Sequence, residues 1–166
     1  MMAGEDTQYH ETLLLYYEEE IEGEAYFSAL SQAFSDLEQS QKLELLARVE
    51  DHAARAVAPL IAKYGLRPRS AAELNLLGQE AAQDTPVDWL ALLDDMRATY
   101  PGYVEDFRAL EHMAPAEDRS RLAFLTQHET AALEFLALEA AQPNQSSEPL
   151  RHYLQQSPII HASGVA

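Results

Sequence analysis

The sequence contains no cysteine among its 166 residues. Without cysteine the chain can form no disulfide, and it has no thiolate nucleophile, iron–sulfur cluster or cysteine-ligated zinc site. Any metal ion bound by this chain would therefore be held by carboxylate oxygens and imidazole nitrogens.

Glycine is also scarce, with six residues in the chain. Alanine, leucine, glutamate and glutamine are abundant instead, and these residues lose little side-chain freedom in a helix. The sequence therefore predicts an all-α protein. Its length and its 47% hydrophobic content are sufficient for one domain with one core.

Basic residues are few, because 11 lysines and arginines stand against 28 acidic residues and leave a formal net charge of −17. A field of this sign repels a phosphate backbone or an anionic lipid surface, so we expect neither nucleic acid nor a membrane as a partner. No apolar run approaches the roughly 20 residues that span a bilayer. The start of the chain lacks the pattern of a signal peptide, and a cytoplasmic location is the expectation.

Apolar residues recur every three or four positions in four segments, which predicts four amphipathic helices at about 7–35, 41–64, 85–113 and 116–141. Gly65 suits the left-handed position that ends a helix, and Thr85 is the expected N-cap of the third helix. The connection 66–84 contains its own short helix, opened by a capping box from Ser70 to Glu73.

Two helical hairpins joined by one long crossover form a four-helix bundle, and we assign residues 1–141 to this domain. From position 142 onward the content of proline, asparagine, serine and glutamine rises. We expect residues 142–166 to form a flexible tail, with at most a helical turn at 148–154.

Three glutamates, Glu24, Glu50 and Glu129, occupy positions in the apolar stripes of the predicted helices. An unpaired carboxylate in a core costs several kcal/mol, by order of magnitude, so such positions call for a partner. Each lies about thirteen residues, or ~20 Å along a helix, from its predicted hairpin turn. The three carboxylates are therefore expected to meet at one level, where they could share protons, pair with cations or hold a metal.

At residues 20–27 (EIEGEAYF) and 47–52 (ARVEDH) the chain resembles the ferritin-like superfamily of di-iron and di-manganese carboxylate proteins, over roughly residues 8–140. The resemblance implies a ferritin-like four-helix bundle that binds iron or manganese. In that family each half contributes one glutamate from its first helix and a Glu-x-x-His from its second. This pattern maps onto Glu24, then Glu50, then an uncertain residue of the third helix, then Glu129.

The chain departs from the family pattern at the two histidines. Ala53 and Ala132 stand three residues after Glu50 and Glu129, where the pattern has histidine. His52 and His128 lie nearby and are the candidate replacements, each of which would have to reach inward from the flank of its stripe. A mononuclear site, an altered dinuclear site and a bundle without metal all remain open.

Two further residues complete the candidate site. Glu20 is a possible additional metal ligand, and the alternative is that it leans to solvent or pairs with Arg48 or Arg55. Tyr103 is the residue expected to face inward from the third helix at the level of the site. It is either a packing residue or, by the resemblance, a catalytic hydrogen-bond donor or radical relay.

Two functions are compatible with this sequence. The first is a metal-dependent oxidase or oxygenase that acts on a small organic substrate, as the resemblance implies. The second is a metal-free bundle that binds a protein or a small molecule, supported by the absent histidines. A homodimer is compatible with either.

Overall fold

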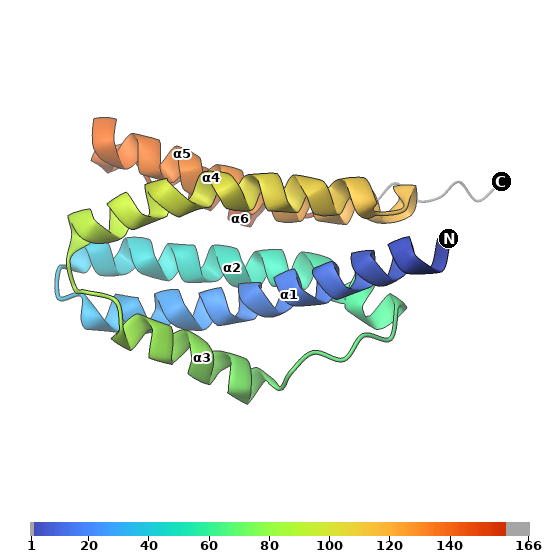
Figure 1. Ribbon diagram of the computed structural model, residues 1–166. Helices are drawn as coiled ribbons and strands as arrows, with labels where there is room; N and C mark the ends of the chain where they lie inside the picture. The colour runs from blue at the N-terminus through green and yellow to red at the C-terminus, as the bar shows by residue number, and fades with distance from the viewer. Residues whose placement is uncertain (1, 159–166) are drawn as a thin grey trace.

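A computed structural model describes residues 2–158, which are all-helical and contain no strand. Four long helices, α1 (Met2–Ala33), α2 (Leu37–Lys63), α4 (Trp89–Met113) and α5 (Arg119–Ala141), run side by side (Figure 1). The shorter α3 (Ala71–Gln83) packs against α1, and α6 (Glu148–Gln155) packs against α5 and α2. Two short 3₁₀ helices, Ala116–Asp118 and Pro143–Gln145, precede α5 and α6. The all-α prediction is confirmed.

Side-chain caps set the beginnings of three helices. Asp36 accepts a hydrogen bond from the Gln39 amide before α2, and Ser70 accepts one from the Glu73 amide before α3, as its capping-box spacing predicts. The N-cap predicted at Thr85 is wrong. Thr85 donates its hydroxyl back to a carbonyl of α3, and Asp88 caps α4 instead.

Gly65 follows α2 with a φ of 61°, which confirms the left-handed C-terminal position predicted for it. The chain then turns toward α3, the helix within the long connection between α2 and α4.

Helix α3 lies unusually close to α1 because of Gly78. A Cβ atom at this position would lie 2.3 Å from the carbonyl oxygen of Glu22 and 2.9 Å from the amide nitrogen of Tyr26. Only a residue without a side chain permits this backbone approach. The end of the connection is also tied to α1, because the hydroxyls of Tyr26 and Thr85 share a hydrogen bond of 3.1 Å.

The core lies between the two helical hairpins, α1–α2 and α4–α5. Its fully buried side chains are mainly leucines and aromatic rings contributed by all four long helices, including Leu13, Phe27, Leu43, Leu110, Leu125 and Phe135. Within residues 2–158, no helix is both long enough and apolar enough to cross a membrane.

The segment after α5 differs from the predicted flexible tail. Helix α6 buries Leu150 and Tyr153 completely or nearly so, and the Tyr153 hydroxyl donates to the carbonyl of Phe124 on α5. These two side chains lie on one face of the short helix and pack it against the bundle. The overall composition of the segment is polar and therefore did not indicate this packing. The remainder of the predicted tail, residues 159–166, lies outside the described residues.

Candidate metal centre

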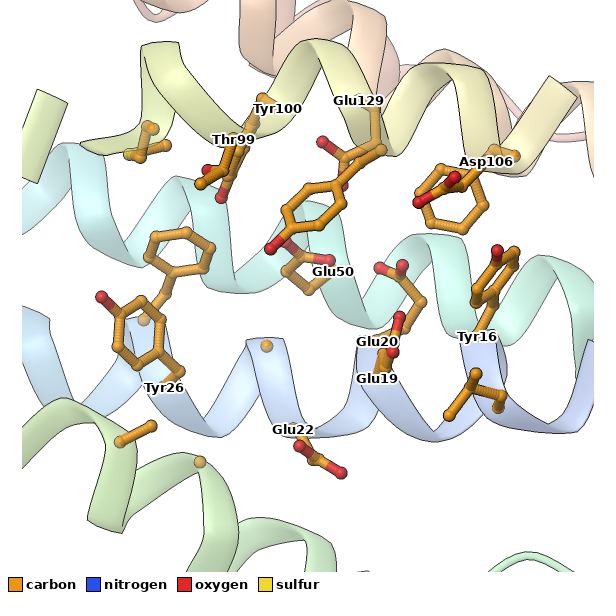
Figure 2. A pocket seen from close by; sticks show the side chains of 18 of the residues that line it. Tyr16, Glu19, Glu20, Glu22, Tyr26, Glu50, Thr99, Tyr100, Asp106 and Glu129 are labelled. Atoms are coloured by element: carbon orange, nitrogen blue, oxygen red, sulfur yellow. The ribbon is translucent and has the colours of Figure 1, made fainter. Parts of the chain in front are cut away.

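Three carboxylates and one imidazole converge in the middle of the molecule. Glu20 comes from α1, Glu50 from α2, and the neighbours His128 and Glu129 from α5. One ligand atom from each residue lies within 4.8 Å of the others. Figure 2 shows the three glutamates directed toward one another from different helices. All four residues are buried, with between 1% and 8% of their surface exposed.

His128 is the centre of this cluster. Its Nε2 atom lies 2.9 Å from Glu20, 3.0 Å from Glu129 and 3.3 Å from Glu50. Its Nδ1 atom contacts the carbonyl oxygen of Leu125, one turn earlier in α5, and a carbonyl can only accept. The proton of a neutral ring therefore resides on Nδ1, which leaves the lone pair of Nε2 directed at the carboxylates.

This arrangement leaves polar atoms without partners. Among the described residues, Glu20 Oε2, His128 Nε2 and Glu129 Oε2 are fully buried and make no hydrogen bond. With the ring proton on Nδ1, all three atoms are acceptors and none can donate to another. Each unsatisfied buried polar group costs about 1–3 kcal/mol, and more when it is charged. A cation between the three atoms would satisfy all of them at once. The donor set, which is rich in carboxylate and contains one imidazole, fits iron or manganese.

The electrostatics of the cluster agree with a place for a cation. Burial raises the pKa of Glu20 well above its ordinary value, and the neighbouring charge of Glu50 raises it further. Burial also raises the pKa of Glu129. Burial alone would lower the pKa of His128, but Glu20 and Glu129 outweigh it and raise this pKa well above its ordinary value. Without a metal, the cluster therefore retains protons that a metal ion would displace.

Gly23 makes room for one of the four ligands. It lies inside α1, where glycine is unfavourable by about 1 kcal/mol relative to alanine. A Cβ atom at this position would lie 3.1 Å from the carboxylate carbon of Glu50. The glycine therefore allows the Glu50 side chain to pass over the α1 backbone and reach the cluster.

A cavity of about 590 Å³ lies beside the cluster, and Glu20, Glu50 and Glu129 form part of its wall. This volume is in the range of pockets that bind small organic molecules, about 300–1,000 Å³. Tyr100 is the buried tyrosine of α4 in this wall, and within the described part of the chain its hydroxyl has no hydrogen-bond partner. Burial and then the charge of Glu129 raise the pKa of Tyr100, so this hydroxyl remains protonated.

The structure brings together four of the six predicted metal ligands: Glu20, Glu50, His128 and Glu129. Glu24 is placed elsewhere. It is half-buried beside Asp51 and Arg55, outside the cluster. The alternative placement of Glu20 at the solvent is wrong, since only 3% of it is exposed.

His52 is the second predicted ligand that lies outside the cluster. It lies two positions after Glu50, which is about 200° around a helix. Its Nε2 atom lies 2.6 Å from the carbonyl oxygen of Gln156, and its ring packs against Phe124 and Tyr153. His52 therefore contacts the segment that follows α6.

Tyr103, the predicted catalytic residue, lines the cavity but is 45% exposed. It borders the opening of the cavity, while Tyr100, one turn earlier, takes the inward position. The prediction that Tyr103 faces inward from this helix is therefore wrong.

In comparisons with known proteins, no family model, no curated protein and no solved structure matches this chain. These comparisons assign neither a family nor an activity. Function must therefore be inferred from the chemistry of the cluster and its cavity.

Proposed function

We propose that this chain is a metal-carboxylate protein that binds iron or manganese through Glu20, Glu50, Glu129 and His128. The observation that carries the proposal is a set of three fully buried polar atoms without a hydrogen bond, all in residues whose ligand atoms lie within 4.8 Å of one another. A fold with a metal-free function would be expected to give these atoms donors or to replace them by apolar groups.

The proposal includes a ferritin-like bundle. In its support, α1–α2 and α4–α5 each form a hairpin, a long connection joins the hairpins, and the carboxylates project into the centre. The chain departs from a two-metal site because, of the described residues, none from α4 joins the cluster.

A single ion is the better match to this ligand set. Ligand atoms on opposite sides of one ion are about 4 Å apart, given bonds of roughly 2.1 Å. The four donor atoms, all within 4.8 Å of one another, need little adjustment to surround one ion. A divalent cation would also neutralise two of the three carboxylate charges.

We propose further that the protein is an oxidase or oxygenase for a small organic substrate. When bound, iron or manganese supplies an open coordination position at which dioxygen or peroxide is activated. The chain's own residues hold the ion and shape the access to it. The Nδ1 contact with Leu125 orients His128, and the cavity beside Glu20 and Glu129 admits the substrate from one side.

Metal content tests the proposal. The protein would be expressed with added iron and manganese, and the metal per chain would be measured by inductively coupled plasma mass spectrometry. Wild type is compared with Glu50→Gln, and Glu44→Gln is the matched control, because Glu44 is an exposed glutamate on the same helix. Circular dichroism verifies that all three proteins fold.

We expect about one iron or manganese ion per chain in wild type and in the control, and almost none in Glu50→Gln. A wild-type protein without metal would reject the proposal and favour a metal-free binding module. Binding of zinc alone would retain the site but reject the oxidase. Oxygen uptake by the loaded protein then tests the redox half of the proposal.

A further inference from the structure

The wall of the cavity beside the cluster is rich in acidic residues. In addition to the three glutamates of the cluster, its wall contains four more acidic residues, which are Glu19, Glu22, Asp95 and Asp106. Lysine, arginine and histidine are absent from the described residues that line it. An anionic molecule entering this cavity would meet repulsion from every side.

Most of the acidic residues at the opening have no basic partner. Glu22 forms an ion pair with Arg69, at 3.2 Å. Glu19, Asp95 and Asp106 form no ion pair with any residue of the described range. Figure 2 shows Glu19 and Asp106 on the facing helices α1 and α4. Their charges are therefore available to a cation from outside the chain.

The rest of the wall is largely aromatic. Tyr16, Tyr26, Tyr100 and Tyr103 line the cavity together with Phe27 and Phe107. Aromatic faces attract cations, by about 0.5–2 kcal/mol in proteins. Such rings also favour an organic ion over a small hydrated one, because they offer apolar contact area.

One observation independent of the acidic residues also points to a ligand. Tyr100 is 92% buried, given its 8% exposure, and it lines the cavity. Its hydroxyl has no hydrogen-bond partner in the part of the chain that the structure describes. The hydroxyl is not one of the fully buried atoms without a partner among the described residues, so it is accessible from the cavity and available to a ligand group there.

We propose that this cavity binds an organic ammonium ion, a small molecule with a positively charged nitrogen and an apolar body. The carboxylates of Glu19 and Asp106 attract the charge, and the aromatic side chains contact the body. The binding of the ammonium ion follows from the cavity alone. Only its role as the oxidised substrate rests on the proposed function.

Three probes of nearly equal shape and different charge test the inference: 2-phenylethylammonium, 2-phenylethanol and phenylacetate. Isothermal titration calorimetry on the purified protein gives the affinity of each. We expect the ammonium ion to bind at least about tenfold more tightly than the alcohol, with phenylacetate showing no binding. Equal affinity for the alcohol, or tighter binding of the acid, would overturn the inference, as would no saturable binding of the ammonium ion.

A pair of double variants separates local from overall charge. Glu19→Gln with Asp106→Asn removes two charges from the cavity. Glu11→Gln with Glu105→Gln removes two from exposed sites on the same helices outside it. We expect roughly tenfold weaker ammonium binding in the first double variant and little change in the second. An equal loss in both would show that net charge alone attracts the probe.

The titrations are carried out on the protein as purified and after treatment with a chelator, with metal content measured in each sample. If the protein expressed with added iron and manganese contains no metal before chelator treatment and still binds the ammonium ion, the proposed function is rejected and this inference is retained. Bound metal without ammonium binding would retain the proposed function and reject this inference.

Discussion

Two buried acidic sites in this molecule differ in how their oxygens are satisfied. Asp118, 1% exposed at the start of α5, accepts hydrogen bonds from the hydroxyls of Tyr9 and Tyr64 at 2.8 and 2.5 Å. It also forms an ion pair of 2.6 Å with Lys63. At the central cluster, by contrast, Glu20 and Glu129 are as deeply buried, and each has an oxygen without any hydrogen bond.

The difference indicates what each site is for. Around Asp118 the chain supplies three donors from two helices, so the carboxylate connects α1 and α2 to α5 and needs nothing from outside. Around Glu20 the chain supplies only further acceptors and one imidazole. Buried acceptors gathered in this way require protons or a cation, which is the physical basis for assigning a ligand to the second site and not to the first.

Replacement of Asp118 should give the largest change in stability. Asp118→Ala leaves the buried Tyr9 hydroxyl and the half-exposed Lys63 without their acceptor, and we expect a loss of about 3 kcal/mol in the free energy of unfolding. Urea denaturation measures this loss. Metal content should remain that of wild type, and a loss of metal would mean that the two sites are not independent.

Replacement of Glu20 should change the stability of the protein in the opposite direction. In metal-free protein, Glu20→Leu removes one of three buried carboxylates that surround a single imidazole, while Glu50 and Glu129 still contact His128. Because the remaining charges are better balanced, we expect the protein to become about 1–3 kcal/mol more stable. The same variant should bind little metal. A destabilisation comparable to that of Asp118→Ala would indicate that Glu20 has a structural partner, contrary to the comparison.

Gly23 allows a finer test of the cluster. Gly23→Ala and its control Gly102→Ala, a helical glycine with no atom near its missing side chain, should each stabilise metal-free protein by about 1 kcal/mol. Only Gly23→Ala places an atom 3.1 Å from the carboxylate of Glu50. We expect its metal affinity to fall roughly tenfold while that of the control is unchanged, as measured by competition with a chelator. Equal affinities would show that the position of Glu50 is not critical.

The smallest effect is the dependence of the Asp118 contribution on pH. Burial acts to raise the pKa of Asp118, but the hydrogen bonds from Lys63, Tyr64 and Tyr9 outweigh it and lower this pKa. A carboxylate with a lowered pKa in the folded state stabilises the fold above its unfolded pKa, and the contribution is lost as pH falls through the folded value. The stability difference between wild type and Asp118→Ala should therefore be constant near neutral pH and shrink below about pH 4. Denaturation at several pH values measures it, and a difference that grows in acid would contradict the assignment.

The sequence was sufficient to find Glu50 and Glu129, because each interrupts an apolar stripe and each is a residue type that needs a partner in a core. It pointed to Glu24 on α1 instead of Glu20 as the main ligand for a simple reason. Helix α1 ends at Ala33, before the predicted turn, and Ala33 is thirteen residues after Glu20, as Glu50 is thirteen after Leu37. A shift of four residues moves the matching level by one helical turn.

The two histidines show a different limit of prediction from sequence. His52 and His128 both flank a stripe glutamate, and periodicity alone does not decide between them. His128 is adjacent to Glu129, about 100° away around α5, and its contact with Leu125 turns its ring into the cluster. His52 lies on the opposite side of α2 from Glu50, where Gln156 and Tyr153 contact it. The sequence could not reveal this without the position of α6.

The close approach of Gly78 to α1 also affects the width of the cavity. Gly78 and Ala81 of α3 are part of the cavity wall, and the backbone of α3 rests directly on α1 at Glu22. A bulkier residue at position 78 would hold α3 away from α1 and widen the cavity without altering the cluster. Gly78, which is remote in sequence from every proposed metal ligand, therefore helps to set the width of the cavity beside the cluster.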